Sequence, residues 1–139
     1  MISQVNTGFY NLLIDSADLQ TALGGSVSDK KIYQVKAPQS SSVPYVTFGL
    51  LTESPIGTFA DFEAIENLTF WINVFSDKST ADLAEIADKV MDSLDDKTIT
   101  VTGYTSMKVV REFISSPTWD LETEIYMQSL RYRVWLDKT

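Results

Sequence analysis

Apolar residues near the start of the chain recur every three or four positions. This spacing predicts a short amphipathic helix, whose buried side is formed by Val5, Phe9, Leu12 and Leu13. A break near Asp15 is followed by a second short helical segment through Leu19 and Leu23. Ser16 can cap the start of that segment, and Gly24-Gly25 can end it, because glycine adopts the left-handed conformation found at helix ends.

The pattern then changes to alternation, which is typical of strands. Short strands are predicted at residues 32–35 and 45–50, and long loops at 36–43 and 53–62. The clearest strand covers residues 68–75. One of its sides carries Leu68, Phe70, Ile72 and Val74, and the other carries Trp71 and Phe75. Because large apolar residues occur on both sides, we expect this strand to be central and covered on both faces.

The segment 79–94 has the strongest helical pattern in the chain. Ser79 and Asp82 match a capping box, in which a hydroxyl and a carboxylate each accept a hydrogen bond from an N–H group at the helix start. An apolar stripe follows, opposite a charged side, and we expect it to pack on a sheet. The stripe consists of Leu83, Ile86, Ala87, Val90 and Leu94.

Strands account for the rest of the chain. They are predicted at residues 98–101, 107–114 and 123–136, with a turn at 115–120. In the last strand, alternation places Tyr126, Leu130, Tyr132, Val134 and Leu136 on one side and Ile125, Met127, Arg131, Arg133 and Trp135 on the other. Residues 1–139 are therefore predicted to form a single α+β domain. It has a mainly antiparallel sheet, an N-terminal helical segment and one long amphipathic helix packed on the sheet.

The chain is acidic, with 19 Asp and Glu residues against 11 Lys and Arg residues and a formal net charge of −8. Nucleic-acid affinity comes largely from cations that displace counterions. We therefore expect no direct nucleic-acid binding, and for the same reason no binding to an anionic membrane. No apolar run approaches the roughly 20 residues of a membrane span, and the first residues lack the features of a signal peptide.

The sequence contains no cysteine and no histidine. The absence of cysteine excludes thiolate chemistry and disulfides. The absence of histidine removes the commonest general base and the commonest metal ligand. One catalytic class that needs neither residue is a hydrolase with paired carboxylates. Asp61, Glu63 and Glu66 lie close together, but their spacing is not that of a calcium loop, and nothing distinguishes them from solvated surface. We predict no catalytic, cofactor-binding or metal-binding residue.

Arg131 and Arg133 are the first candidates for an interface. They are two residues apart on a predicted strand and so project from one face. They either meet acidic residues of a neighbouring subunit or pair within the chain, for example with Glu112 on the preceding strand.

Three aromatic residues are the other candidates. Trp119, in a predicted turn, either folds back over the edge of the sheet or anchors a partner, since large aromatic residues are enriched at binding hot spots. Phe59 and Phe62 lie in the long loop 53–62. Apolar residues in such a loop either fold back on the core or contact a partner.

Several stretches follow one another in a recognisable order over nearly the whole chain. They are Leu23-Gly24-Gly25, Lys31-Ile32-Tyr33, Ala37-Pro38-Gln39, Val43-Pro44-Tyr45-Val46, the strand from Leu68 to Ser76, the helix segment from Ala84 to Val90, and Leu130-Arg131-Tyr132-Arg133. This order resembles a family of tailed-phage proteins described as tail-completion or tail-to-head joining proteins. The chain departs from the family in the loop Ser40-Ser41-Ser42 and in the turn between its last strands.

The resemblance implies a structural subunit of a virion that is assembled in the host cytoplasm. Such a protein would cap the tail tube as a homo-oligomeric ring, a hexamer, and join it to the head-side connector. Its partners would be other copies of itself, the tail tube protein and the head-tail connector proteins. The family offers no catalytic residue and no cofactor to carry over.

Other interpretations stay open at this stage. A head-side neck protein or a minor tail protein would belong to the same assembly. A peptide-binding adaptor would use an exposed strand edge and remain a monomer. A carboxylate-based hydrolase is the most distant alternative. The mass of the native protein distinguishes a ring from the monomeric adaptor.

Overall fold

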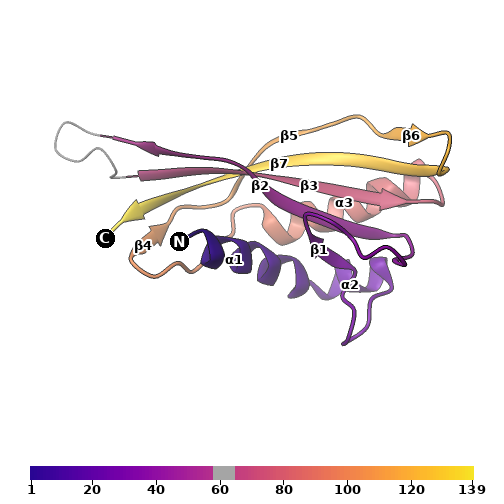
Figure 1. Cartoon of the computed structure of the whole chain (residues 1–139), viewed down its shortest axis with the longest axis horizontal. Coiled ribbons are helices and arrows are strands. Elements are labelled where there is room, and N and C mark those ends of the chain that lie inside the picture. The colour runs from indigo at the N-terminus through magenta and orange to yellow at the C-terminus, as the bar shows by residue number, and fades with distance from the viewer. Residues whose placement is uncertain (58–64) are drawn as a thin grey trace.

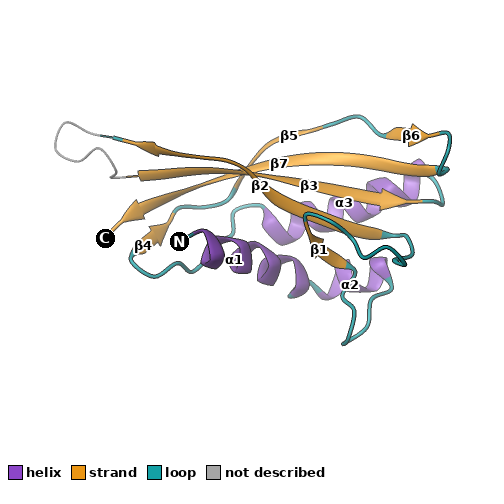
Figure 2. Ribbon diagram, viewed as in Figure 1, coloured by secondary structure: helices purple, strands orange, loops and turns teal. Residues whose placement is uncertain are grey.

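The computed structural model describes residues 1–57 and 65–139. Within these ranges the chain forms one mainly antiparallel sheet with helices packed on one of its faces (Figures 1 and 2), which confirms the predicted α+β class. The helices are α1 (Ile2–Ile14), α2 (Ala17–Leu23) and α3 (Thr80–Leu94). The strands are β1 (Ile32–Gln34), β2 (Tyr45–Ile56), β3 (Ile65–Ser76), β4 (Tyr104–Ser106), β5 (Val110–Ile114), β6 (Thr118–Asp120) and β7 (Ile125–Lys138).

The sheet is built around the antiparallel pair β3 and β7. β2 pairs with the other edge of β3, and β1 continues the sheet as a short strand parallel to β2. Beyond β7, the three short strands β6, β5 and β4 follow one another along the same edge, each antiparallel to β7. The sheet is therefore five strands wide, with its last position divided into three pieces.

The first two helices lie where their sequences predict them. α1 buries Val5, Phe9 and Leu13, while α2 buries Leu19 and Leu23. The Ser16 side chain accepts a hydrogen bond from the backbone N–H of Leu19, and Gly24 ends α2 with a φ of 69°. Both features are local, because each depends on residues within one turn of the helix end.

The long helix α3 also has the predicted stripe, but only half of the predicted capping box. The Ser79 hydroxyl accepts a hydrogen bond from the backbone N–H of Asp82 at 3.1 Å. The Asp82 carboxylate does not return to Ser79; it accepts a hydrogen bond of 2.6 Å from the hydroxyl of Ser76, at the end of β3. This bond ties the helix start to the strand before it.

The hydrophobic core lies between the helices and one face of the sheet. On β3, this face carries four side chains with no exposed surface: Leu68, Phe70, Ile72 and Val74. The ring of Phe9 in α1 stacks on that of Phe70 with centroids 3.9 Å apart. Alternate residues of β7 and the stripe of α3 complete the core, so the predicted buried sides of β3, α3 and β7 are confirmed.

The predicted loop 53–62 is wrong over its first residues, because β2 continues to Ile56. Pro55, which has no N–H group to donate, pairs with Glu66 in the register of β2 and β3. A proline is tolerated here because β1 pairs only with residues 46–48, which leaves this part of β2 at the edge of the described sheet. β2 and β3 are consequently longer than their hydrophobic pattern suggests.

The predicted strand 98–101 is also wrong. Ile99 and Val101 are buried, but the segment has no ladder and only an isolated bridge from Val101 to Tyr104. Ile99 packs so tightly on α1 that a Cβ atom on Gly8 would lie 2.8 Å from the Cβ atom of Ile99. The segment therefore covers a helix instead of joining the sheet.

The predicted strand 107–114 is wrong over its first three residues, because β5 begins only at Val110, after the buried Val109. This side chain is fully buried, and its backbone N–H donates to the carbonyl of Lys97 at 2.7 Å while its carbonyl accepts from the N–H of Asp96. The chain leaves the edge of β7 at this point and returns to it at Val110. The apolar side chain turns into the core and separates β4, which ends at Ser106, from β5.

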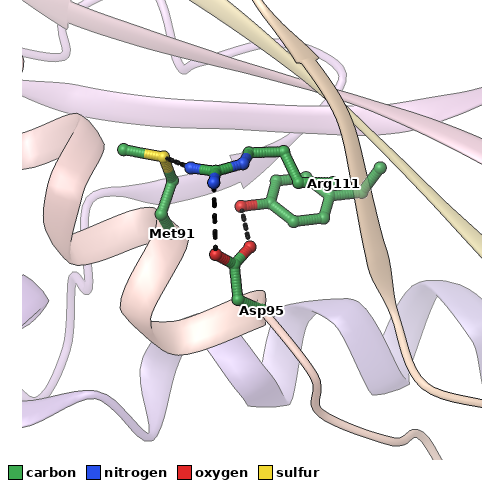
Figure 3. Close-up of polar contacts among 4 residues, drawn as sticks. Met91, Asp95 and Arg111 are labelled. Carbon is green, nitrogen blue, oxygen red and sulfur yellow. Dashed lines mark hydrogen bonds and ion pairs between the residues drawn. The ribbon is translucent and has the colours of Figure 1, made fainter.

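A polar cluster joins the end of α3 to the sheet (Figure 3). The Tyr132 hydroxyl donates to the Asp95 carboxylate at 2.8 Å, and the Arg111 guanidinium lies 3.8 Å from the other oxygen of Asp95. Arg111 also contacts the sulfur of Met91. Burial raises the pKa of Tyr132 above its usual value, and the hydrogen bond to Asp95 raises it further.

The packing of α3 can be tested with two core truncations. Leu83→Ala and Ile86→Ala should each lower the free energy of unfolding by about 2–5 kcal/mol, because both side chains are fully buried and the change leaves a cavity. Chemical denaturation measures this. Ala84→Gln, at an exposed position of the same helix, should change stability by less than about 0.5 kcal/mol. Equal effects at all three positions would contradict the packing.

The polar cluster makes the stability of the fold depend on pH in the alkaline range. The pKa of Tyr132 is higher in the folded protein than in the unfolded chain. Its contribution to the free energy of unfolding is therefore complete below pH 10.0, the ordinary pKa, and is lost as the pH rises above that value. Tyr132→Phe should lower the free energy of unfolding by about 1–2 kcal/mol at neutral pH. Above pH 10.0, the variant should lose stability less steeply than the unsubstituted protein. Denaturation curves at several pH values test this, and parallel pH profiles for both proteins would refute it.

Candidate interaction surface

The face of the sheet that points away from the helices has no helix or second sheet over it in the described part of the chain (Figure 2). The expectation that the central strand is covered on both faces is therefore wrong for a single copy of the chain. We call this surface the outer face. In the centre of the sheet it consists of Asn67, Thr69, Trp71, Asn73 and Phe75 on β3 and Met127, Ser129, Arg131, Arg133 and Trp135 on β7.

One row of residues crosses the outer face at its middle. Trp71 lies between Gly49 on β2 and Arg131 on β7, and Arg131 lies opposite Phe113 on β5. A Cβ atom on Gly49 would be 2.6 Å from the ring of Trp71. The indole therefore lies over the glycine, where no other residue would leave room for it.

The two arginines project from the outer face, as their spacing predicts. The guanidinium of Arg131 lies 5.4 Å from the centroid of the Phe113 ring, and that of Arg133 lies 4.8 Å from the Trp135 ring. In the described residues neither arginine forms an ion pair, so the proposed pairing with Glu112 does not occur. Each guanidinium is held by an aromatic face and keeps its N–H groups available.

Hydrogen bonds between side chains keep the rest of the outer face in place. The indole N–H of Trp135 donates to the side-chain oxygen of Asn67 at 2.9 Å. The hydroxyl of Ser129 donates to the side-chain oxygen of Asn73 at 2.6 Å. Both bonds link β7 to β3, so the surface is ordered before any partner binds.

Two hollows open on the outer face beside the pair Tyr45 and Phe75, whose ring centroids are 4.9 Å apart. One has a volume of about 380 Å³ and extends towards Met127 and β6. The other has a volume of about 410 Å³ and extends towards Trp71 and the segment 35–41. Aromatic rings therefore form the floor of both hollows.

Trp119 lies in strand β6, whereas the sequence placed it in a turn. It pairs with Tyr126, with ring centroids 6.3 Å apart, and so shares the helix side of the sheet with that residue. Its side chain is 47% exposed. Trp119 and the two arginines therefore belong to opposite faces. Phe59 and Phe62 lie outside the described residues, so their role stays a prediction.

Of the three carboxylates considered for catalysis, the structure describes only Glu66. Asp61 and Glu63 lie outside the described residues, and Glu66 is 8% exposed on the helix side of β3. Residues 1–57 and 65–139 contain no group of three potential ligands that could hold a metal ion. In the same ranges, no helix is long and apolar enough to cross a membrane.

The sequence showed which residues share the outer face but not that this face is open. Trp71, Phe75, Met127 and Trp135 alternate with core residues, and alternation alone assigns them to one side. Their apolar character suggested a covering element within the chain. The informative feature is that large apolar residues and arginine occur together, which is typical of protein interfaces.

Two solved structures share this fold. One is a chain of a structure described as the virion of a native gene transfer agent (GTA) particle, with a TM-score of 0.76 and 16% identity over 97% of this chain and 96% of that chain. The other is described as the structure of bacteriophage SPP1 gp17 protein, with a TM-score of 0.59 and 15% identity over 99% and 90% of the two chains. No curated protein matches the sequence.

A family model described as tail completion protein gp17 matches residues 8–137. The match covers nearly the whole chain, including α3, strands β1 to β6 and all but the last residue of β7. It confirms the resemblance found in the order of the sequence segments. The chain belongs to the tail completion protein gp17 family and has a structural role in a phage tail.

Proposed function

We propose that this chain caps the tail tube as a ring of identical copies, a hexamer, and joins the tube to the head-side connector. The observation that carries the proposal is the family match over residues 8–137, because tail completion describes an event at the end of a tail. The similar fold of a chain from the virion of a GTA particle agrees with a place in a particle.

The outer face supports an assembly of several copies. Half-exposed aromatic side chains and arginines without an ion pair lie together on the outer face, and such residues dominate the binding energy of interfaces. A single copy leaves them in water. A ring would cover this side in every copy, because closed symmetry repeats the same contact around the axis.

A second candidate is a peptide-binding adaptor, and one observation favours it. From Gly49 to Ile56 the edge of β2 has no neighbouring strand in the described residues, so its backbone groups are available to an added strand. Such an adaptor would act as a monomer. The oligomeric state of the protein separates the two candidates.

The purified protein should therefore be a ring. We expect a native mass six times the 15.6 kDa of one chain and annular particles in negative-stain images. Native mass spectrometry and electron microscopy at micromolar concentration provide both measurements. A monomer that stays a monomer when isolated tails are added would exclude a ring subunit and favour the adaptor.

The ring should also not bind duplex DNA in 150 mM salt. The formal net charge of −8 gives few cations to displace counterions from the phosphates. If the lumen of the ring is negatively charged, DNA would pass through it without adhering. Fluorescence anisotropy with a labelled duplex measures the affinity, and a dissociation constant below about 1 µM would contradict the expectation, since non-specific binders typically reach only 10⁻⁴–10⁻⁶ M.

A further inference from the structure

The outer face carries two positive charges without a partner. Arg131 is exposed and Arg133 is half-buried, and neither forms an ion pair in the described residues. The rings of Phe113 and Trp135 lie beside the two guanidinium groups. A planar guanidinium favours a carboxylate, which can accept two parallel hydrogen bonds.

The opposite side of the domain carries an acidic stripe without a partner. Glu85, Asp88 and Asp92 are exposed on α3, at intervals that place them on one side of the helix, away from its buried stripe. None of the three forms an ion pair in the described part of the chain. α3 packs on the inner face of the sheet, so this stripe and the outer face lie on opposite sides of a two-layer domain (Figure 2).

The spacings of the two sets of charges agree. Arg131 and Arg133 are two residues apart on a strand, which separates their Cα atoms by about 6.8 Å. Asp88 and Asp92 are four residues apart on a helix, which corresponds to about 6 Å along its axis. Two arginines can therefore meet two carboxylates one helical turn apart, within the reach of flexible side chains.

We propose that the outer face of one copy docks the exposed side of α3 of the next copy, with Arg131 and Arg133 against Asp88 and Asp92. The proposal rests on the ring proposed above and specifies its contact. Because the two surfaces lie on opposite sides of the chain, the contact runs head to tail, and head-to-tail contacts generate rings when the rotation closes.

Charge also disfavours the simplest alternative contact. Two outer faces packed against each other would place arginines opposite arginines, and like charges in an interface are unfavourable. The α3 stripe instead offers carboxylates to Arg131 and Arg133. Beside the arginines, Trp71 and the exposed Val110 and Phe113 supply the apolar surface that the helix would cover.

Charge reversal tests the contact. Arg131→Glu with Arg133→Glu should reduce the native mass from that of the ring to that of one chain, and Asp88→Arg with Asp92→Arg should do the same. A chain with all four changes should recover the ring, because every contact is then reversed on both sides. Lys97→Glu with Lys138→Glu is the control matched to the arginine variant. It changes the net charge by the same amount at exposed positions that belong to neither surface and should leave the ring intact.

The outcomes separate this contact from the proposed function. If the unsubstituted protein is a ring and the arginine variant remains one, the contact is wrong while the ring stands. If both reversed pairs dissociate the ring but the combined variant does not restore it, α3 is not the surface that the arginines meet. If the unsubstituted protein forms no ring at all, both the contact and the proposed ring are wrong. Circular dichroism of every variant shows that the fold is retained.

Discussion

β3 and β7 pair residue by residue, from Ile65 opposite Asp137 to Ser76 opposite Tyr126. This uninterrupted antiparallel pairing sets the position of nearly every other element. It aligns the fully buried side chains of both strands on one face, and α1 and α3 pack over them. The same alternation sends Trp71, Arg131 and Trp135 to the other face. A residue cannot be added to either strand without exchanging core and surface, so the core and the outer face are fixed together.

Features that depend on neighbouring residues in the sequence could be predicted. The cap of α2 at Ser16, its end at Gly24 and the stripe of α3 all depend on contacts within a few positions. The ends of strands could not be predicted in the same way. β2 passes Pro55 because β3 is there to pair with it. The segment 98–101 is not a strand because Ile99 packs on α1 instead of pairing with a strand. Residues 107–109 are not part of a strand because the side chain of Val109 is buried in the core. Each of these depends on a residue distant in the sequence.

In the candidate interface, too, local features could be predicted and features that depend on distant residues could not. That Arg131 and Arg133 share a face follows from their spacing alone. That Phe113 and Trp135 hold them, and that Glu112 does not pair with them, depends on the bulge in β5, where the register moves from Arg111 directly to Phe113. Trp119 was expected in a turn because Pro117 and its polar neighbours suggest one. β7 is long enough to pair with this segment, and that pairing places the tryptophan on the helix side.

The positions of the three tryptophans have a spectroscopic consequence. Trp71 and Trp135 are half-buried on the outer face and Trp119 is exposed at the sheet edge, so none of them lies in the buried core. The core aromatic residues are phenylalanine and tyrosine, including Phe9, Phe70 and Tyr132. The intrinsic fluorescence emission of this protein therefore reports the solvation of its surfaces instead of the integrity of its interior. A change in emission wavelength without a change in secondary structure would record the covering of a sheet face by another molecule, with no added label.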